Sequence, residues 1–168
     1  MKGLPDAILL RLEGWLGDHP YPSLTASEGE RERPIEEGKG PILFGSQGFF
    51  TLPPGRGYIV QALAAGYLAR QTPDLENWAR VVESRVPHER HPAVWTMTLL
   101  YMSILFIGDR RQATQLYDAV IQICPAVLRH PAALQAIARV VGRVEPRERL
   151  QGWLGRLRGD DAATCLQA

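Results

Sequence analysis

Fifteen successive residues without a charge, from Ala93 to Ile107, dominate the pattern of apolar and polar positions along the chain. At helical spacing the apolar residues of this stretch cover every face, which predicts a helix buried all round. The stretch is too short to span a bilayer, which needs about 20 such residues. We therefore expect a central helix surrounded by other helices, with four interior side chains: Trp95, Leu99, Met102 and Phe106.

Helical periodicity predicts further helices on both sides of the central one. Residues 4–16 carry an amphipathic stripe that Trp15 widens, made of Leu4, Ile8, Leu9, Leu12 and Leu16. Residues 57–71 are nearly all apolar and predict a second interior helix. Helix starts are expected where a capping residue or a proline precedes an apolar stripe, at Thr72-Pro73, His91-Pro92, Asp109 with Gln112, His130-Pro131 and Glu145-Pro146. The stripe after His130-Pro131 is expected to turn Leu134, Ile137, Val140 and Val141 inward.

The region between the first two helices has a different character. Residues 20–40 are polar and crowded with mixed charges, and we expect this long loop to be mobile or ordered only by a partner. Residues 41–52 read as two apolar runs around a glycine-containing turn, which predicts a β-hairpin. Its Phe49 and Phe50 side chains either cover the helices or form an exposed apolar site for a partner.

Part of the helical region contains an internal sequence repeat, which we call an echo. Arg90-His91-Pro92-Ala93 recurs as Arg129-His130-Pro131-Ala132, and at the same offset Trp78 meets Tyr117, Val81 meets Val120 and Val82 meets Ile121. A weaker third echo pairs Leu75, Trp78 and Val82 with Leu150, Trp153 and Leu157. In period and element order this arrangement is similar to tetratricopeptide or HEAT-type repeats. The small-residue and aromatic signature of the tetratricopeptide pattern is not readable, so the resemblance implies a repeat-like helical stack and no family.

These observations predict an all-α fold of six or seven helices stacked as antiparallel pairs, with a small N-terminal β-hairpin and a long polar loop. We expect one domain over residues 1–168, in which the helical stack of about two and a half degenerate repeats is the main part. Its parts are an N-terminal helix (1–17), the loop and hairpin (18–56), the helical stack (57–158) and a flexible tail (159–168).

Composition excludes little. The formal net charge of +1 gives no global attraction to nucleic acid or acidic membranes. The basic residues are two lysines and seventeen arginines, which suits bidentate recognition of phosphate or carboxylate but also fits a GC-rich coding bias. Two cysteines, Cys124 and Cys165, make no disulfide framework and indicate a reducing cytoplasm. No transmembrane segment is expected, and charges interrupt the apolar core that a signal peptide would need.

No motif predicts an assembled catalytic site or a cofactor. Gly38-Lys39-Gly40 lacks the glycine and the Ser or Thr of a phosphate-binding loop, and the turn at Ser46 lacks the spacing of a nucleophile elbow. His88 and His91, with His130 from the next echo, are the weak candidates for metal ligands. The alternative is that His91 and His130 are helix-start residues, as their repeated setting suggests.

Arginine is concentrated in the C-terminal third of the chain. Arg139, Arg143, Arg147 and Arg149 are expected to form one exposed basic patch across the junction of the last two helices. Such a patch either binds an acidic partner, contacts nucleic-acid phosphates, or is simply a solvated face.

The sequence thus favours a non-enzymatic protein-interaction module, an adaptor or regulatory subunit that binds a protein partner through a helical-stack surface. One alternative is a nucleic-acid-associated protein using the C-terminal arginine face. Another is a small metal-dependent enzyme at His88 and His91.

Overall fold

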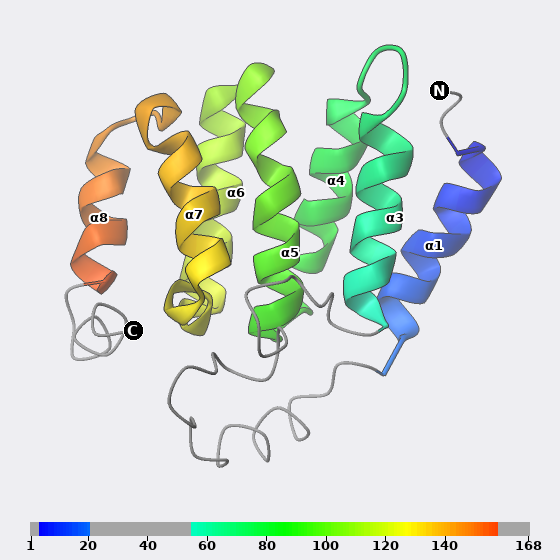
Figure 1. Cartoon of the computed structure of the whole chain (residues 1–168), viewed down its shortest axis with the longest axis horizontal. Coiled ribbons are helices and arrows are strands. Elements are labelled where there is room, and N and C mark those ends of the chain that lie inside the picture. The colour runs from blue at the N-terminus through cyan, green and yellow to red at the C-terminus, as the bar shows by residue number, and fades with distance from the viewer. Residues whose placement is uncertain (1–3, 21–54, 158–168) are drawn as a thin grey trace.

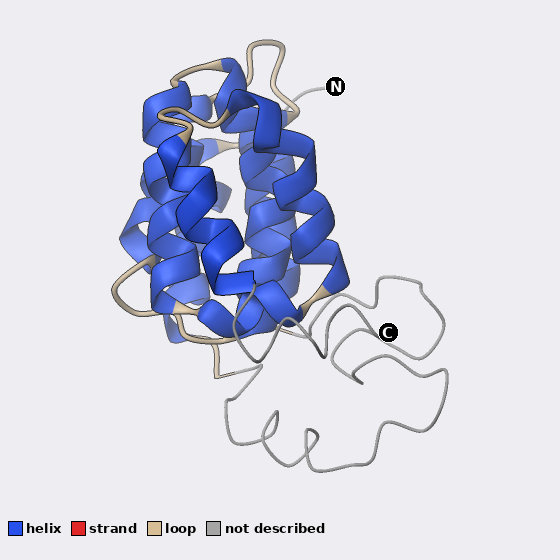
Figure 2. Ribbon diagram, turned by 90° about the vertical axis from the view of Figure 1, so that its left-hand side faces the viewer, coloured by secondary structure: helices blue, strands red, loops and turns tan. Residues whose placement is uncertain are grey.

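The computed structural model describes residues 4–20 and 55–157, and these residues contain seven α-helices and no strand. Figure 2 shows them as helices joined by short loops. The predicted all-α fold is confirmed for this part of the chain. The predicted hairpin with Phe49 and Phe50, nearly all of the polar loop and the C-terminal tail lie outside the described residues.

The helices follow the predicted order closely. The α-helices are α1 (Asp6–Asp18), α3 (Arg56–Leu68), α4 (Leu75–Arg85), α5 (Pro92–Met102), α6 (Arg110–Ile123), α7 (Pro131–Val140) and α8 (Glu148–Leu157). Three short 3₁₀ segments continue or join them: η2 (Ser103–Ile107), η3 (Pro125–Arg129) and η4 (Val141–Arg143).

The helices form two rows, with α1 at one end and α8 at the other (Figure 1). α3, α5 and α7 lie side by side in one row, where α3 contacts α5 and α5 contacts α7. α4 and α6 lie in the row behind, and α6 also contacts α8. A single cluster of buried apolar side chains fills the space between the rows.

The central helix lies in the interior, as predicted, for most of its length. Every residue from Pro92 to Leu99 is buried, and the four predicted interior side chains, Trp95, Leu99, Met102 and Phe106, are at most 2% exposed. The prediction of one helix buried all round is wrong at the C-terminal end. There the α-helix gives way to 3₁₀ turns from Ser103, and the changed periodicity leaves Ile107 71% exposed.

Three of the predicted helix starts are confirmed by their caps. His91, Asp109 and His130 are N-caps whose side chains accept hydrogen bonds from main-chain N–H groups in the first turn. The prediction that Thr72 caps α4 is wrong. Asp74 is the N-cap instead, because its carboxylate accepts from the Asn77 N–H at 3.2 Å and the Asn77 side-chain amide at 3.0 Å.

Two other burial predictions are wrong. Val141 is 44% exposed because α7 ends at Val140 and Val141 lies in the following 3₁₀ turn. The apolar residues of α3 are not all interior, since Tyr58 is 53% exposed.

α1 is attached to both neighbouring helices by polar as well as apolar contacts. Leu9 packs over Gly66 of α3, where a Cβ would collide with the leucine side chain. The Glu13 carboxylate accepts a hydrogen bond from the Tyr67 hydroxyl and two from Arg80 of α4, at 3.0 and 2.8 Å. Burial and the bond to Glu13 raise the pKa of Tyr67 to about 12. These contacts fix which face of α1 points outward.

Within residues 4–20 and 55–157, no helix has both the length and the apolar content needed to cross a bilayer.

Candidate functional site

The histidines that could have held a metal are placed for helix capping. Nδ1 of His91 accepts from the Ala93 N–H at 3.1 Å, and Nδ1 of His130 accepts from the Ala132 N–H at 3.2 Å. His88 is exposed in the turn before α5. Among the residues that the structure describes, no three His, Cys, Asp or Glu side chains come together in a way that could hold a metal ion.

The cap at His130 depends on a neutral imidazole. Burial lowers the pKa of His130 from 6.5 to about 4, because a charged ring would lose its hydration. A neutral ring can leave Nδ1 unprotonated, which the hydrogen bond from Ala132 requires. The His130 side chain can therefore accept this capping hydrogen bond throughout the neutral pH range.

Sequence reasoning missed a buried ion pair between Arg56 and Glu89. The Glu89 side chain is 4% exposed and accepts from Arg56 Nε at 2.8 Å and Nη2 at 3.3 Å. It also accepts from the N–H groups of Arg90 and His91, at 2.9 and 2.8 Å. Arg56 Nη1 donates to the His19 carbonyl at 2.7 Å, so the pair ties the end of α1 to the turn before α5. Because these donors occupy both carboxylate oxygens, we interpret the pair as structural.

The four predicted partner-binding arginines are all exposed and come from different elements. Arg139 lies in the last turn of α7, Arg143 in η4, Arg147 just before α8 and Arg149 in its first turn. Arg149 donates to the carboxylate of Asp118 on α6 at 2.5 Å. The single patch that joins all four arginines stays a prediction.

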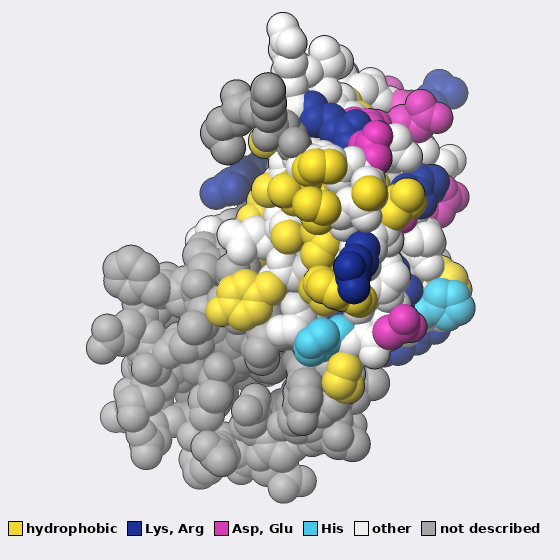
Figure 3. Space-filling view, turned by 90° about the vertical axis from the view of Figure 1, so that its right-hand side faces the viewer, with side chains coloured by type: hydrophobic (Ala, Val, Ile, Leu, Met, Phe, Trp, Pro, Cys, Tyr) yellow, Lys and Arg dark blue, Asp and Glu magenta, His cyan; other side chains and the backbone are white. Residues whose placement is uncertain are grey.

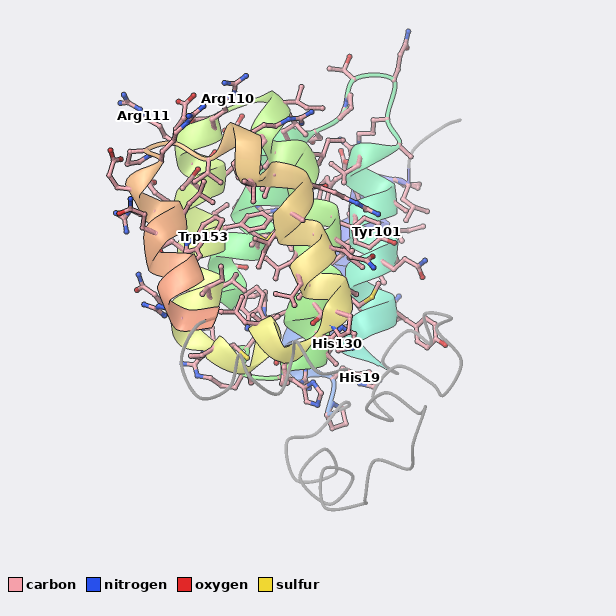
Figure 4. All side chains as sticks on the ribbon, turned by 60° about the vertical axis from the view of Figure 1, so that its left-hand side comes forward. His19, Tyr101, Arg110, Arg111, His130 and Trp153 are labelled. Atoms are coloured by element: carbon pink, nitrogen blue, oxygen red, sulfur yellow. The ribbon has the colours of Figure 1, made fainter. Side chains whose placement is uncertain are left out.

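Asp118 also connects Arg149 to the core. Its other oxygen accepts from the Trp153 indole at 3.2 Å, and the Trp153 ring stacks on Tyr117 with centroids 5.8 Å apart. Figure 4 shows Trp153 between α8 and the other helices, with Arg110 and Arg111 projecting from the end of the rows opposite His19 and His130.

Among the residues that the structure describes, three exposed apolar side chains lie on or just before the outer face of α1. Ile8 and Trp15 are 46% and 51% exposed and lie seven residues apart on one face of α1, and Leu4, just before the helix, is 37% exposed. We call these three residues the α1 apolar surface. The Arg11 guanidinium lies over the Trp15 ring, 5.3 Å from its centroid. Figure 3 shows apolar side chains gathered on this end of the molecule around basic ones.

The apolar stripe predicted for the first helix is only partly buried in the structure. The predicted stripe is present, but only Leu9 and Leu16 are fully buried, against α3 and its neighbours. The stripe is wider than the contact that covers it. Ile8 and Trp15 occupy the half that the other helices do not cover, whereas Leu4, before α1, is partly exposed and also lies against Gly66 of α3.

Comparison of the chain with protein-family models, with curated protein sequences and with solved structures gave no match.

Proposed function

We propose that the protein is a non-enzymatic protein-interaction module, an adaptor or regulatory subunit, that contacts its partner through the α1 apolar surface. The observation that carries this proposal is the exposure of Ile8 and Trp15 on one face of α1, with Leu4 exposed just before the helix. Clustered apolar side chains on the surface of a soluble domain are typical of interaction sites.

The position of this surface supports the proposal. Stacked helical proteins need polar outer faces on their terminal helices to remain soluble. α8 exposes Glu148, Arg149, Gln151 and Arg156 among those of its residues whose side chains are described. α1, at the opposite end, presents apolar side chains instead. The two ends therefore differ, and the α1 end has the character of a contact surface.

The spacing of the surface favours an amphipathic helix as the bound element. Residues at positions 8, 11 and 15 of α1 form a narrow seam of the kind that a second helix covers. Arg11 lies within this seam, and no anionic group among the described residues pairs with it. The partner helix is therefore expected to carry an acidic side chain opposite Arg11.

We further propose that α4 with α5, and α6 with α7, are copies of one helix pair. Two observations support a repeat. His91 and His130 cap α5 and α7 through the same Nδ1 contact. The paired positions of the sequence echo, Trp78 with Tyr117, Val81 with Val120 and Val82 with Ile121, are all at most 2% exposed. Superposition of residues 72–107 on 109–141 in an experimental structure tests this, and unrelated packing angles would refute the repeat.

Nucleic-acid association is the second candidate function. Arg139, Arg143 and Arg147 are exposed, and the described part of the chain supplies no ion-pair partner for them. Phosphate contacts would give sequence-independent binding that weakens as salt rises. Retention on duplex DNA at low salt and release at moderate salt would favour this function. For the metal-dependent enzyme, no observation adds support.

The main proposal is tested by capturing proteins from the native source with the tagged full chain. Ile8→Asp and Trp15→Asp place a charge in the α1 apolar surface, while Leu10→Asp is the matched control. Leu10 is 64% exposed and lies about 200° around the helix from Ile8. We expect a discrete protein to be recovered with wild type and Leu10→Asp, and at least about tenfold less with the other two, a change of about 1.4 kcal/mol.

Unchanged melting temperatures would show that all three variants are folded. Equal recovery with all of them, or recovery of nucleic acid alone, would refute the α1 apolar surface as the contact site.

A further inference from the structure

A cavity of about 450 Å³ opens between α6 and the turn that leads into α8. It is lined by Arg111, Thr114, Gln115, Glu145, Pro146 and Arg149. A volume in this range matches sites that hold small molecules or a few residues of a peptide. Its lining residues belong to α6, α8 and the turn before α8. These helices lie away from α1 in the stack (Figure 1), so the cavity is separate from the α1 apolar surface.

Within the part of the chain that the structure describes, not all of the charged side chains that line the cavity have an ion-pair partner. The Glu145 carboxylate lies 3.2 Å from Arg110 Nη1, and the Arg149 guanidinium pairs with Asp118 at 2.5 Å. Arg111 also lines the cavity, and within residues 4–20 and 55–157 its guanidinium has no hydrogen-bond or ion-pair partner. A guanidinium presents five N–H donors in a planar fork that matches a carboxylate. Because Arg111 is exposed, its guanidinium can pair with an anion that enters the cavity.

The cavity wall is held in place by buried contacts. The Thr114 hydroxyl, in a residue 1% exposed, donates to the Arg110 carbonyl at 2.8 Å and accepts from the Glu145 N–H at 3.1 Å. This residue thus ties the turn before α8 to the first turn of α6. On the other side, the buried Trp153 indole holds Asp118, which in turn holds Arg149. Preformed walls of this kind reduce the ordering cost of binding.

We propose that this cavity binds the carboxylate of an Asp or Glu side chain within an acidic peptide segment, with Arg111 as the pairing residue. A lone anion would leave most of the volume unfilled, whereas a peptide segment brings backbone and side-chain groups for Gln115 and the Pro146 ring. Glu145 and Asp118 beside the arginines disfavour a polyphosphate backbone, which gains from many unopposed cations. A single carboxylate, in contrast, can be bound by the guanidinium of Arg111 alone.

The test is binding of a fluorescein-labelled oligoglutamate peptide to the full chain, measured by anisotropy at low salt. Arg111→Glu reverses the charge in the cavity, and Arg111→Lys keeps the charge but removes the fork. Arg90→Glu is the matched control, because it makes the same charge change on an exposed arginine in the turn before α5. An oligoglutamine peptide and a duplex DNA oligonucleotide are the comparison probes.

We expect oligoglutamate to bind wild type and Arg90→Glu equally. It should bind about threefold more weakly to Arg111→Lys and at least about tenfold more weakly to Arg111→Glu. Oligoglutamine should not bind. Equal losses in Arg111→Glu and Arg90→Glu, or no binding by wild type, would overturn the proposal. Tighter, Arg111-dependent binding of DNA would also overturn it and assign the cavity to phosphate. Because Ile8→Asp leaves this cavity intact, failure here is distinguishable from failure of the α1 apolar surface.

Discussion

The hydroxyl of Tyr117 on α6 donates a hydrogen bond to the carbonyl oxygen of Leu99 on α5, at 2.8 Å, inside the core. At the end of α5 the α-helix changes to 3₁₀ turns, so its last carbonyls need partners from elsewhere. Tyr117 supplies one, and the indole of Trp78 on α4 supplies another to the Tyr101 carbonyl at 3.3 Å. Both helices in the row behind, α4 and α6, therefore donate hydrogen bonds that hold the end of α5 in place.

Replacing Tyr117 by Phe removes this donor and leaves a buried carbonyl without it. The expected loss in the free energy of unfolding is about 1–3 kcal/mol, measured by urea titration. Tyr58→Phe is the control, since Tyr58 is 53% exposed and should lose little. Equal stabilities of Tyr117→Phe and wild type would contradict a bridging role for the hydroxyl.

Replacing Leu99 by Ala should destabilise the protein through a cavity at the centre of the fold. Leu99 is 0% exposed, and a fully buried leucine truncated to alanine costs about 2–5 kcal/mol. Denaturant titration measures this loss, with exposed Leu10→Ala as the reference. If the loss at Leu99 were under about 1 kcal/mol, α5 would not be the centre of the core.

Replacing Glu89 by Ala leaves Arg56, 14% exposed, without its buried carboxylate. Breaking a buried pair from one side costs about 3–5 kcal/mol. We expect a correspondingly large fall in the free energy of unfolding, whereas Glu83→Ala on the exposed side of α4 should be nearly neutral. Similar melting temperatures for the two variants would show that the Arg56–Glu89 pair does not hold α1 and α3 to the turn before α5.

The His130 cap predicts a pH dependence of stability. The pKa is about 4 in the folded chain and 6.5 in the unfolded one, so the unfolded state binds more protons between these values. Stability contributed by the neutral ring is therefore present above pH 6.5 and is lost as the pH falls toward 4. His130→Asn keeps a capping side chain that does not titrate and should flatten this part of the profile. His88→Asn, at an exposed position, should follow wild type; if His130→Asn also followed wild type, the cap would not be titrating.

Local signals allowed the sequence to predict most of the helices. A stretch apolar on every face identifies an interior helix, and the residues that cap α5, α6 and α7 carry their own hydrogen-bonding chemistry. Where two cap residues stand close together, as Thr72 and Asp74 do, sequence alone does not decide between them. The structure places Asp74 at the cap because its carboxylate reaches the N–H of Asn77.

The candidate surfaces were less predictable because they depend on contacts between distant residues. The stripe of α1 was readable, but which half α3 covers depends on the fit of Leu9 over Gly66. Arg56 and Glu89 are 33 residues apart, and nothing local marks them as partners. Arg149 was predicted as a binding residue, but its place beside Arg111 in one cavity depends on how α8 packs against α6.

Site-specific photocrosslinking can detect whether a protein partner covers the α1 apolar surface, as we propose. Photoreactive benzoylphenylalanine at position 15 places the reactive group on that surface, and the same residue at position 10 places it on another face of α1. Irradiation in the native source is predicted to give a discrete protein adduct from position 15 and none from position 10. The absence of an adduct at position 15, or the same adducts from both positions, would contradict the claim.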